Sequence, residues 1–261
     1  MTRKQVNYDA VASTYNRRFA EERRSGTLLA LQEMVRAAGS GRVLEVGCGT
    51  GHWLAGLSGT PKGLYGVDLS AGMLAQAQER FLPFTLVRGR AEALPFASAS
   101  LDLVYCVNAI HHFARPDEFI RQARLVLRGG GALAVLGMDP RIQRHDWYVY
   151  DYFEGVYETE LNRFPPWEQV QAWMVQCGFE RIEFRVVDEL GGPKYGRDVL
   201  KDPFLEKNAT SQLILLSDEA YAAGLGHIRG ALENAERVGE TLIFQNTIRI
   251  QMLTGWIENV G

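Results

Sequence analysis

The segment Leu44–Gly51, in which an apolar strand runs directly into three alternating glycines, constrains this chain more than any other feature. The strand is Arg42–Val46, and Gly47, Gly49 and Gly51 follow it. Glycine is required where a backbone turns sharply and approaches a ligand, because no Cβ stands in the way. Open α/β sheets place their ligands at the carboxyl ends of their strands. The segment therefore predicts a nucleotide-binding α/β fold.

Short apolar runs alternate with stretches of helical spacing from about residue 41 to residue 138. Strands that are apolar on both faces and alternate with helices indicate a parallel sheet covered by helices on both sides. Two further helices are predicted upstream, within residues 8–39. The predicted strands are Arg42–Val46, Gly63–Val67, Phe84–Val87, Leu101–Val107 and Ala132–Gly137.

The alternation breaks after Gly137. A helix is predicted from Pro165-Pro166 to Gln176, and a strand follows at Phe179–Val187. Another helix is predicted from about Asp218 to Val238, and a final strand at Thr241–Leu253. We predict a core made of residues 1–188 and 239–261, into which residues 189–238 are inserted as a helical cap.

The residues around the glycine turn distinguish between adenosine cofactors. Asp68 ends the second predicted strand, where its carboxylate can accept hydrogen bonds from both hydroxyls of a ribose. A dinucleotide site needs Gly-x-Gly-x-x-Gly, but His52 or Leu54 occupies the place of the third glycine. Glu45 precedes the first glycine by two positions, and its carboxylate suits a cationic ligand better than a pyrophosphate. The pattern favours a cationic adenosine cofactor over a nicotinamide dinucleotide.

From about Tyr8 to Met138 the chain resembles the class I S-adenosylmethionine-dependent methyltransferases, and most closely their small-molecule subfamily of the ubiquinone/menaquinone-biosynthesis type. Each motif alone is weak, but all of them occur in the family's order and spacing. The resemblance implies a doubly wound, Rossmann-like, mostly parallel sheet of seven strands with an antiparallel last strand. The motifs are Glu45-x-Gly47-x-Gly49-x-Gly51, Gly66–Ser70, Ala91–Phe96, Leu101–Val104 and Leu127–Gly131.

The resemblance also implies how S-adenosylmethionine is bound. Asp68 would bind the ribose, Leu69 and Met73 would flank the adenine, and Asn108 would lie under the methionine part. Tyr15 matches a position that closes over the cofactor in such enzymes. The full set of expected cofactor-binding residues is Tyr15, Glu45, Gly47, Gly49, Asp68, Leu69, Met73, Ala91, Glu92 and Asn108.

Arg90 departs from the family pattern. The family usually has an acidic residue here, which accepts a hydrogen bond from the adenine amino group. An arginine side chain has no acceptor, although its guanidinium plane can stack on a base.

Two features remain open to two interpretations. His111 and His112 follow the fourth strand, where a histidine can act as a general base or position an acceptor, or can be structural. The aromatic block Trp147–Tyr157 can wall an acceptor pocket or belong to the core. No spacing of His, Cys or Asp forms a metal-ligand set.

Composition and charge disfavour several other classes of protein. The net charge of −3 gives no basic field for nucleic acid. The three cysteines Cys48, Cys106 and Cys177 are scattered, so neither a disulfide framework nor a metal cluster is predicted. No apolar stretch reaches the roughly 18 residues that span a bilayer, and no signal peptide is visible. We expect a cytoplasmic protein.

These features predict an enzyme that moves the methyl group of S-adenosylmethionine onto a small-molecule acceptor by direct in-line displacement. A non-catalytic S-adenosylmethionine-binding protein of the same fold is the alternative, and only Arg90 favours it. An NAD-dependent oxidoreductase is disfavoured by the glycine spacing. The residues identify neither the acceptor nor an oligomeric state.

Overall fold

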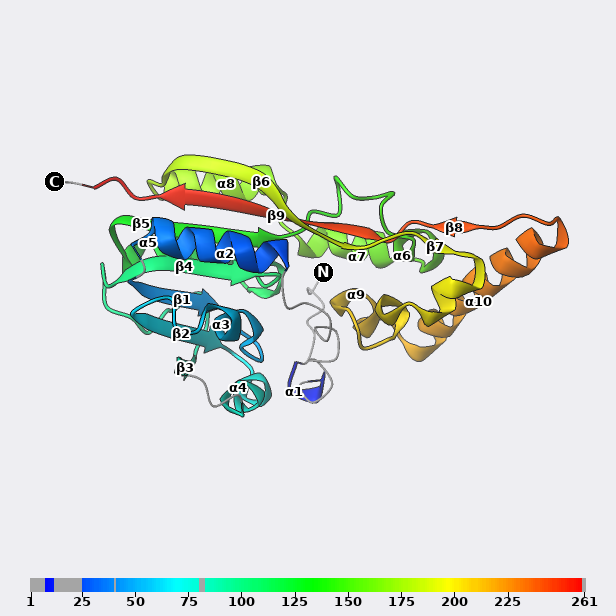
Figure 1. Ribbon diagram of the computed structural model, residues 1–261, viewed down its shortest axis with the longest axis horizontal. Coiled ribbons are helices and arrows are strands. Elements are labelled where there is room, and N and C mark those ends of the chain that lie inside the picture. Colours follow the sequence, from blue (N-terminus) through cyan, green and yellow to red (C-terminus); the bar gives the residue numbers. More distant parts are fainter. Residues whose placement is uncertain (1–7, 12–24, 40, 80–82, 260–261) are drawn as a thin grey trace.

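The computed structural model describes residues 8–11, 25–39, 41–79 and 83–259 (Figure 1). Within them, a central sheet of seven strands runs in the order β3-β2-β1-β4-β5-β9-β6. The predicted doubly wound, mostly parallel fold is confirmed. The strands of this sheet are β1 Arg42–Val46, β2 Gly63–Asp68, β3 Thr85–Arg88, β4 Leu101–Val107, β5 Leu127–Gly137, β6 Glu180–Gly191 and β9 Thr247–Trp256.

Strands β1 to β5 pair in parallel, and β9 is antiparallel to both of its neighbours, β5 and β6. The parallel strands therefore end at one edge of the sheet, as the glycine turn after β1 requires. β4 lies at the centre of the sheet and is buried along its whole length. Its run from Leu101 to Val107, which is apolar except for Asp102, is the pattern of a strand covered on both faces.

The helices cover both faces of the sheet. Leu103 and Tyr105 of β4 pack in one buried cluster with α2 and α3, while Val104 and Cys106 pack in the other with α5 and α8. Side chains of successive strand residues point to opposite faces, so β4 contributes alternately to the two clusters. The helices are α1 Tyr8–Val11, α2 Gly26–Ala37, α3 His52–Leu57, α4 Ala71–Gln78, α5 Pro116–Val126, α6 Val149–Tyr152, α7 Val156–Arg163, α8 Trp167–Gln176, α9 Ser211–Ile214 and α10 Asp218–Arg237.

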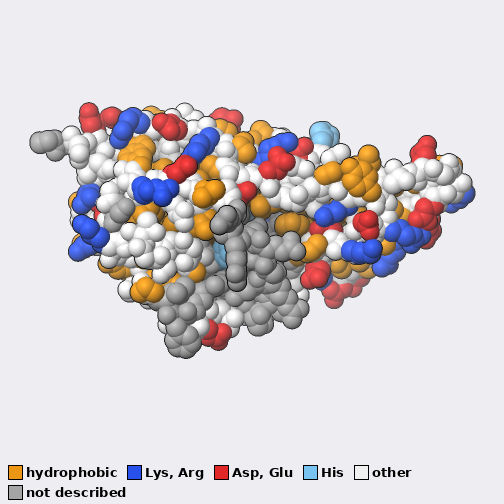
Figure 2. Space-filling model, viewed as in Figure 1, with side chains coloured by type: hydrophobic (Ala, Val, Ile, Leu, Met, Phe, Trp, Pro, Cys, Tyr) orange, Lys and Arg blue, Asp and Glu red, His pale blue; other side chains and the backbone are white. Residues whose placement is uncertain are grey.

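A second lobe lies beyond the carboxyl ends of the parallel strands, at the right of Figure 1. It holds α6, α7, α9 and α10, which pack on one another and on short connecting elements. On the face seen in Figure 2, acidic and basic side chains are interspersed over both lobes. The remaining elements are β7 Lys194–Tyr195, β8 Ile243–Phe244 and the 3₁₀ turns η2 Ile110–His112, η3 Gly196–Lys201 and η4 Pro203–Leu205.

Three strand boundaries differ from the prediction. β5 begins at Leu127 instead of Ala132, because Leu127 already pairs with Leu101 before a bulge in the ladder. β6 continues to Gly191, where it still pairs with β9. The strand predicted at 241–253 is divided into β8 and β9, since Asn246 between them forms a bridge with Trp147 instead of joining the sheet.

The described residues contain neither a membrane-spanning helix nor a cluster of metal ligands. Every helix there is too short or too polar to cross a lipid bilayer. No group of three or more His, Cys, Asp or Glu side chains in the same part of the chain is placed to hold a metal ion.

Candidate functional site

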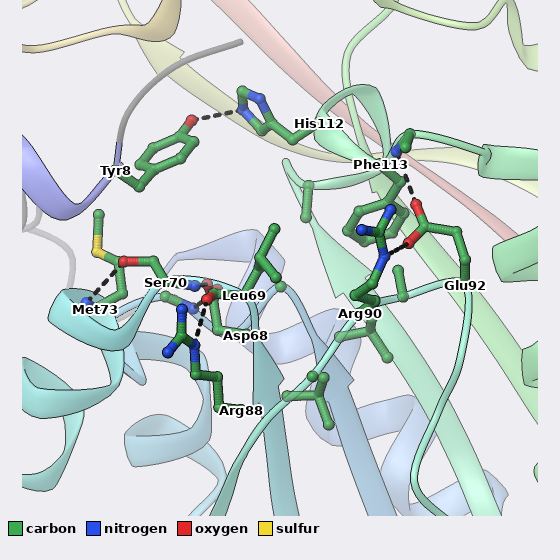
Figure 3. Close-up of a pocket in the computed structure, with 18 of the residues that line it drawn as sticks. Tyr8, Asp68, Leu69, Ser70, Met73, Arg88, Arg90, Glu92, His112 and Phe113 are labelled. Atoms are coloured by element: carbon green, nitrogen blue, oxygen red, sulfur yellow. Dashed lines mark hydrogen bonds and ion pairs between the residues drawn. The ribbon is translucent and has the colours of Figure 1, made fainter.

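A pocket of about 370 Å³, called here the first pocket, opens where β1, β2 and β4 end (Figure 3). Its size lies within the usual range of small-molecule sites. It brings together most of the side chains expected to bind a cofactor, although they come from separate parts of the sequence. The predicted residues that line it are Gly47, Gly49, Asp68, Leu69, Met73, Ala91, Glu92, Asn108 and His112.

The glycine turn forms one wall of the first pocket. Gly47 has a φ of +74°, and a Cβ there would lie 2.6 Å from the Cβ of Ala109. Gly49 has a φ of +52°, and a Cβ there would meet no described atom within 4 Å. Gly47 is thus needed for close packing, whereas Gly49 keeps a space on the pocket wall open to a ligand.

Asp68 is held at the end of β2 by two backbone hydrogen bonds. Its Oδ2 accepts from the Gly49 N–H and its Oδ1 from the Ser70 N–H, both at 2.8 Å. Each carboxylate oxygen has a second lone pair, so a ligand hydroxyl can still be accepted. Burial raises the pKa of Asp68, while the hydrogen bonds from Ser70 and Gly49 oppose that rise.

Glu45 and Tyr15 are not among the described residues that line the first pocket. Glu45 lies beneath the glycine turn and is 1% exposed. Its Oε2 accepts a hydrogen bond from the Tyr105 hydroxyl at 3.2 Å, and burial raises its pKa well above the ordinary value. Tyr15 lies outside the described residues.

Glu92 joins two walls of the first pocket. Its Oε1 accepts hydrogen bonds from the backbone N–H groups of Ala114 at 2.8 Å and Arg115 at 3.2 Å. Its Oε2 lies 3.4 Å from Nε of Arg90, whose side chain is largely exposed. The Glu92 carboxylate therefore links the segment after β3 to the loop after β4, and Figure 3 shows Arg90 beside it.

Tyr8 and Asp9 of α1 close another side of the first pocket, and sequence reasoning missed both. The Tyr8 hydroxyl lies 2.6 Å from Nε2 of His112 (Figure 3). Oδ1 of Asp9 accepts hydrogen bonds from the Ser70 hydroxyl at 2.5 Å and the Gly72 N–H at 2.8 Å. The signal for both residues was the segment Tyr8-Asp9-x-Val11-Ala12-x-x-Tyr15, from which only Tyr15 is among the expected cofactor-binding residues.

A second pocket, of about 140 Å³, adjoins the first and shares Tyr8, Val107, Asn108 and His112 with it. No Asp, Glu, Lys or Arg occurs among its described lining residues. Asn108 has a left-handed backbone with φ of +48°, which asparagine tolerates better than most residues. The other residues that line it are Thr27, Trp53, His111, Met138, Trp147, Phe164, Leu190, Phe204, Ala209, Thr210, Ser211, Gln212, Ile248 and Ile250.

The aromatic block and His111 have mixed roles. Trp147 lines the second pocket, whereas Tyr148 and Phe153 are buried outside its lining. The ring of His111 stacks on Phe164, with ring centroids 3.8 Å apart and an interplanar angle of 14°. The block is thus partly a pocket wall and partly core.

A buried ion pair lies behind His112. Nη2 of Arg163 is 3.4 Å from Nδ1 of His112, and Nη1 donates to Glu160 Oε1 at 2.7 Å. Gln212 of α9 donates to the other Glu160 oxygen at 2.5 Å. Arginine can only donate, so Nδ1 must accept, and the proton of the neutral ring is then on Nε2, facing Tyr8. Burial raises the pKa of Glu160 to about 7.

Several known methyltransferases are similar to this chain in sequence. A family model described as "Methyltransferase domain" matches residues 44–135. A ubiquinone/menaquinone biosynthesis C-methyltransferase from Stenotrophomonas maltophilia is 30% identical over an alignment of 175 residues, and the match covers 55% of this chain and 68% of that protein. A malonyl-acyl-carrier-protein O-methyltransferase from Pectobacterium atrosepticum is 30% identical over an alignment of 181 residues, and the match covers 66% of this chain and 69% of that protein.

A solved structure shares the fold. Phosphoethanolamine N-methyltransferase 2 from Haemonchus contortus, in complex with S-adenosyl-L-methionine, superposes with a TM-score of 0.58 and 18% identity. The match covers 96% of this chain and 57% of that protein. The family-model match runs from β1 into β5 and includes most of the residues of the first pocket.

Proposed function

Since this chain belongs to the class I S-adenosylmethionine-dependent methyltransferases, we propose that its first pocket holds the methyl donor and its second pocket a small, uncharged acceptor. The observation that carries the proposal is the wall that the two pockets share at Tyr8, Asn108 and His112. Two ligands bound on either side of this wall would have their reacting atoms close together. Such proximity is the main catalytic requirement of a direct displacement.

The residues of the first pocket fit S-adenosylmethionine. Gly49 leaves open space beside the Asp68 carboxylate, which suits a ribose carrying two hydroxyls. Leu69 is 61% exposed although it is large and apolar, and Met73 lies on the same wall. A bound adenine would cover the Leu69 side chain and remove its apolar surface from water. In this proposal the guanidinium plane of Arg90 contacts the edge of the adenine. It is the plane that makes this contact because the Nε of Arg90 is directed to Glu92.

When bound, S-adenosylmethionine supplies an electrophilic methyl group on a sulfonium. Around it, Tyr8 and His112 form a polar contact across the junction of the pockets. Because Arg163 occupies Nδ1 of His112, this histidine offers Nε2–H as a donor and is not placed to remove a proton. We assign it to positioning of the acceptor, and assign α1 to the exclusion of water from the reacting atoms.

The acceptor of this enzyme is uncharged in our proposal. The second pocket contains no Lys or Arg among its described lining residues, so a carboxylate would lose its hydration without a counter-charge. A malonyl group, as in the name of one relative, carries such a carboxylate. The lining favours an acceptor closer to the quinone type named in the other relative.

The second lobe completes the acceptor site. Thr210, Ser211 and Gln212 line the second pocket, and they belong to the 189–238 segment. We therefore assign residues 189–238 to a cap over a core of residues 1–188 and 239–261, and α6 and α7 extend from that core into the second lobe, where they pack against the cap. No observation favours a non-catalytic role for this arrangement.

Isothermal titration tests the donor assignment directly. S-adenosylmethionine and S-adenosylhomocysteine should each bind saturably, one molecule to a chain. Acceptors can then be screened by release of S-adenosylhomocysteine, with uncharged aromatic compounds and their carboxylated analogues as matched pairs. Turnover should occur only with the uncharged member of a pair. Lack of binding by a folded sample, or turnover restricted to carboxylates, would contradict the proposal.

A further inference from the structure

The buried ion pair of α7 is fully enclosed by protein, although neither of its members is among the described residues that line the two pockets. Glu160 is 0% exposed and Arg163 is 2% exposed. Arg163 Nη1 and the side-chain amide of Gln212 together occupy both carboxylate oxygens of Glu160. A buried ion pair stabilises a fold little more than a well-packed apolar pair of the same size would. The role of this pair is therefore better sought in the group that it holds in place.

That group is the ring of His112, which lines both pockets. Arg163 Nη2 lies 3.4 Å from Nδ1 of the ring, and the Tyr8 hydroxyl lies 2.6 Å from Nε2. The ring of His111 packs beside it, with ring centroids 3.9 Å apart. The imidazole is thus contacted at both of its nitrogens, by the second lobe on one side and by α1 on the other.

The hydrogen bonds of this chain of residues can run in one direction only. A guanidinium donates and never accepts, so Nδ1 of His112 accepts from Arg163. A neutral imidazole then carries its proton on Nε2, which donates to the Tyr8 oxygen. The proton of the Tyr8 hydroxyl consequently points away from His112. Without Arg163, the ring can carry its proton on Nδ1 and accept at Nε2, as a general base does.

We propose that Glu160 and Arg163 are positioning residues, which fix His112 as the Nε2–H tautomer at the wall shared by the two pockets. This inference rests on the proposed function, which places donor and acceptor on the two sides of that wall. Glu160 holds the Arg163 side chain and offsets its charge, so the donor's sulfonium meets no net positive charge there. Through Gln212, the cap supports this arrangement from α9. The second lobe thus sets the direction of a hydrogen bond inside the site.

Nitrogen NMR of the full-length chain reads the tautomer directly. The sequence has five histidines, and the signals of His112 are assigned by their loss in His112→Phe. At about pH 8, above the ordinary histidine pKa of about 6.5, long-range proton–nitrogen correlations distinguish the protonated ring nitrogen from the unprotonated one. In the wild type, Nε2 of His112 should carry the proton. A proton on Nδ1 would overturn the inference, because it is incompatible with donation from Arg163.

Removing both charges tests the ion pair without leaving one of them buried alone. In the double variant Glu160→Gln/Arg163→Met, the donor to Nδ1 of His112 is lost. The two ring-nitrogen shifts should therefore move toward each other, as expected when both tautomers are populated. Shifts identical to those of the wild type would overturn the inference. If the double variant does not fold, the wild-type spectrum still decides.

Arg141→Met is the matched control for a merely structural effect. Arg141 also anchors α7, since it donates to the Leu161 carbonyl at 2.7 Å and to the Phe164 carbonyl at 3.0 Å. None of its described hydrogen bonds reaches His112. This variant should loosen the same segment and leave the His112 tautomer unchanged. Equal movement of the His112 shifts in Arg141→Met and in the double variant would overturn the inference.

Kinetics give a second measurement once the screen has supplied an acceptor. The double variant should lower kcat by about tenfold, because the groups at the shared wall are no longer oriented. Its affinity for S-adenosylhomocysteine should stay within about threefold of the wild type, since Asp68 and the glycine turn are untouched. An unchanged kcat would contradict a positioning role.

The two proposals fail separately. Absence of S-adenosylhomocysteine binding to the folded wild type overturns the proposed function. Normal S-adenosylhomocysteine binding, together with a His112 tautomer that does not respond to loss of the ion pair, overturns the positioning inference alone.

Discussion

At the scale of a single residue, Asp68 connects three parts of the donor site. Its carboxylate joins the glycine turn to the start of α4 through Gly49 and Ser70, and it faces the first pocket. Asp68→Ala should weaken S-adenosylhomocysteine binding by about 1.5–3 kcal/mol, the scale of lost charge-assisted hydrogen bonds. Calorimetry measures the loss. Asp68→Asn keeps one acceptor oxygen and should lose less, and unchanged affinity in the alanine variant would contradict the ribose assignment.

At Gly49, the effect of a side chain on donor binding can be separated from the effect of backbone strain on stability. Gly49→Val places a side chain in the open space of the first pocket, so donor binding should fall below detection by calorimetry. Gly39, after α2, also has a positive φ and also has no atom within 4 Å of a built Cβ. Gly39→Val should cost similar stability, about 1–2 kcal/mol, and keep donor binding. Equal binding by both variants would show that the turn is not the site.

Glu160 makes stability depend on pH. Burial raises its pKa in the folded chain to about 7, above its ordinary value of 4.5. Between these values the folded state binds more proton than the unfolded state, so stability is greatest at low pH and is lost as pH rises toward 7. Glu160→Gln should flatten this loss in urea unfolding measured from pH 4.5 to pH 7. Parallel curves for variant and wild type would contradict the assignment to Glu160.

Which residues were predictable depends on how far apart their partners are in sequence. Asp68 ends β2 and Gly49 lies in the turn after β1, and the parallel sheet brings such positions together at one edge. Glu45 also belongs to the motif, but it is the last but one residue of β1 and points into the core. The contact of Tyr8 with His112 joins residues 104 apart, and that of Arg163 with His112 joins residues 51 apart. Local pattern carries no signal for such pairs.

At the scale of elements, α1 is a short helix over the first pocket, where Asp9 holds it to α4 and Tyr8 contacts His112. Asp9 accepts from Ser70 and Gly72 at the start of α4, and these hydrogen bonds lower its pKa. The contact between α1 and the start of α4 is therefore stabilised when pH is above the ordinary pKa of aspartate. It is lost as pH falls and the Asp9 carboxylate is protonated. Asp9→Ala should weaken donor binding several-fold and lower turnover, measured by calorimetry and initial rates. Asp9→Asn keeps one acceptor oxygen, so its donor affinity and its turnover should lie between those of the wild type and those of Asp9→Ala.

Strands were easier to predict than the connections after β5. β1, β2 and β4 are short apolar runs between glycines and charges, and their observed bounds lie within one residue of the prediction. The break between β8 and β9 depends on Asn246, whose Nδ2 donates to Oδ2 of Asp202 at 2.6 Å. That contact lies in the second lobe and interrupts a run of apolar and β-branched residues. α6 and α7 were not predicted, because Gly155 and dense aromatics obscure their helical period.

At the scale of the whole molecule, the two pockets lie where the sheet and the second lobe meet. The first pocket is built almost entirely from the core, and the comparisons match this part of the chain. The second pocket takes residues from α2, β4, β6, α9 and β9, which are distant in sequence. The donor was therefore predictable from contiguous motifs, whereas the acceptor could be addressed only after the fold had assembled its pocket.

The position of β9 has a consequence for synthesis on the ribosome. Among the described strands, β6 pairs only with β9, and the edge of β5 that faces away from β4 is also covered by β9. A nascent chain that has emerged only as far as α10 thus carries an apolar β5 with one bare edge and a β6 without any sheet partner. Unpaired strand edges are templates for association with other chains. We expect this incomplete chain to need shielding by a chaperone until residue 256 has been released, although its donor pocket can already be complete.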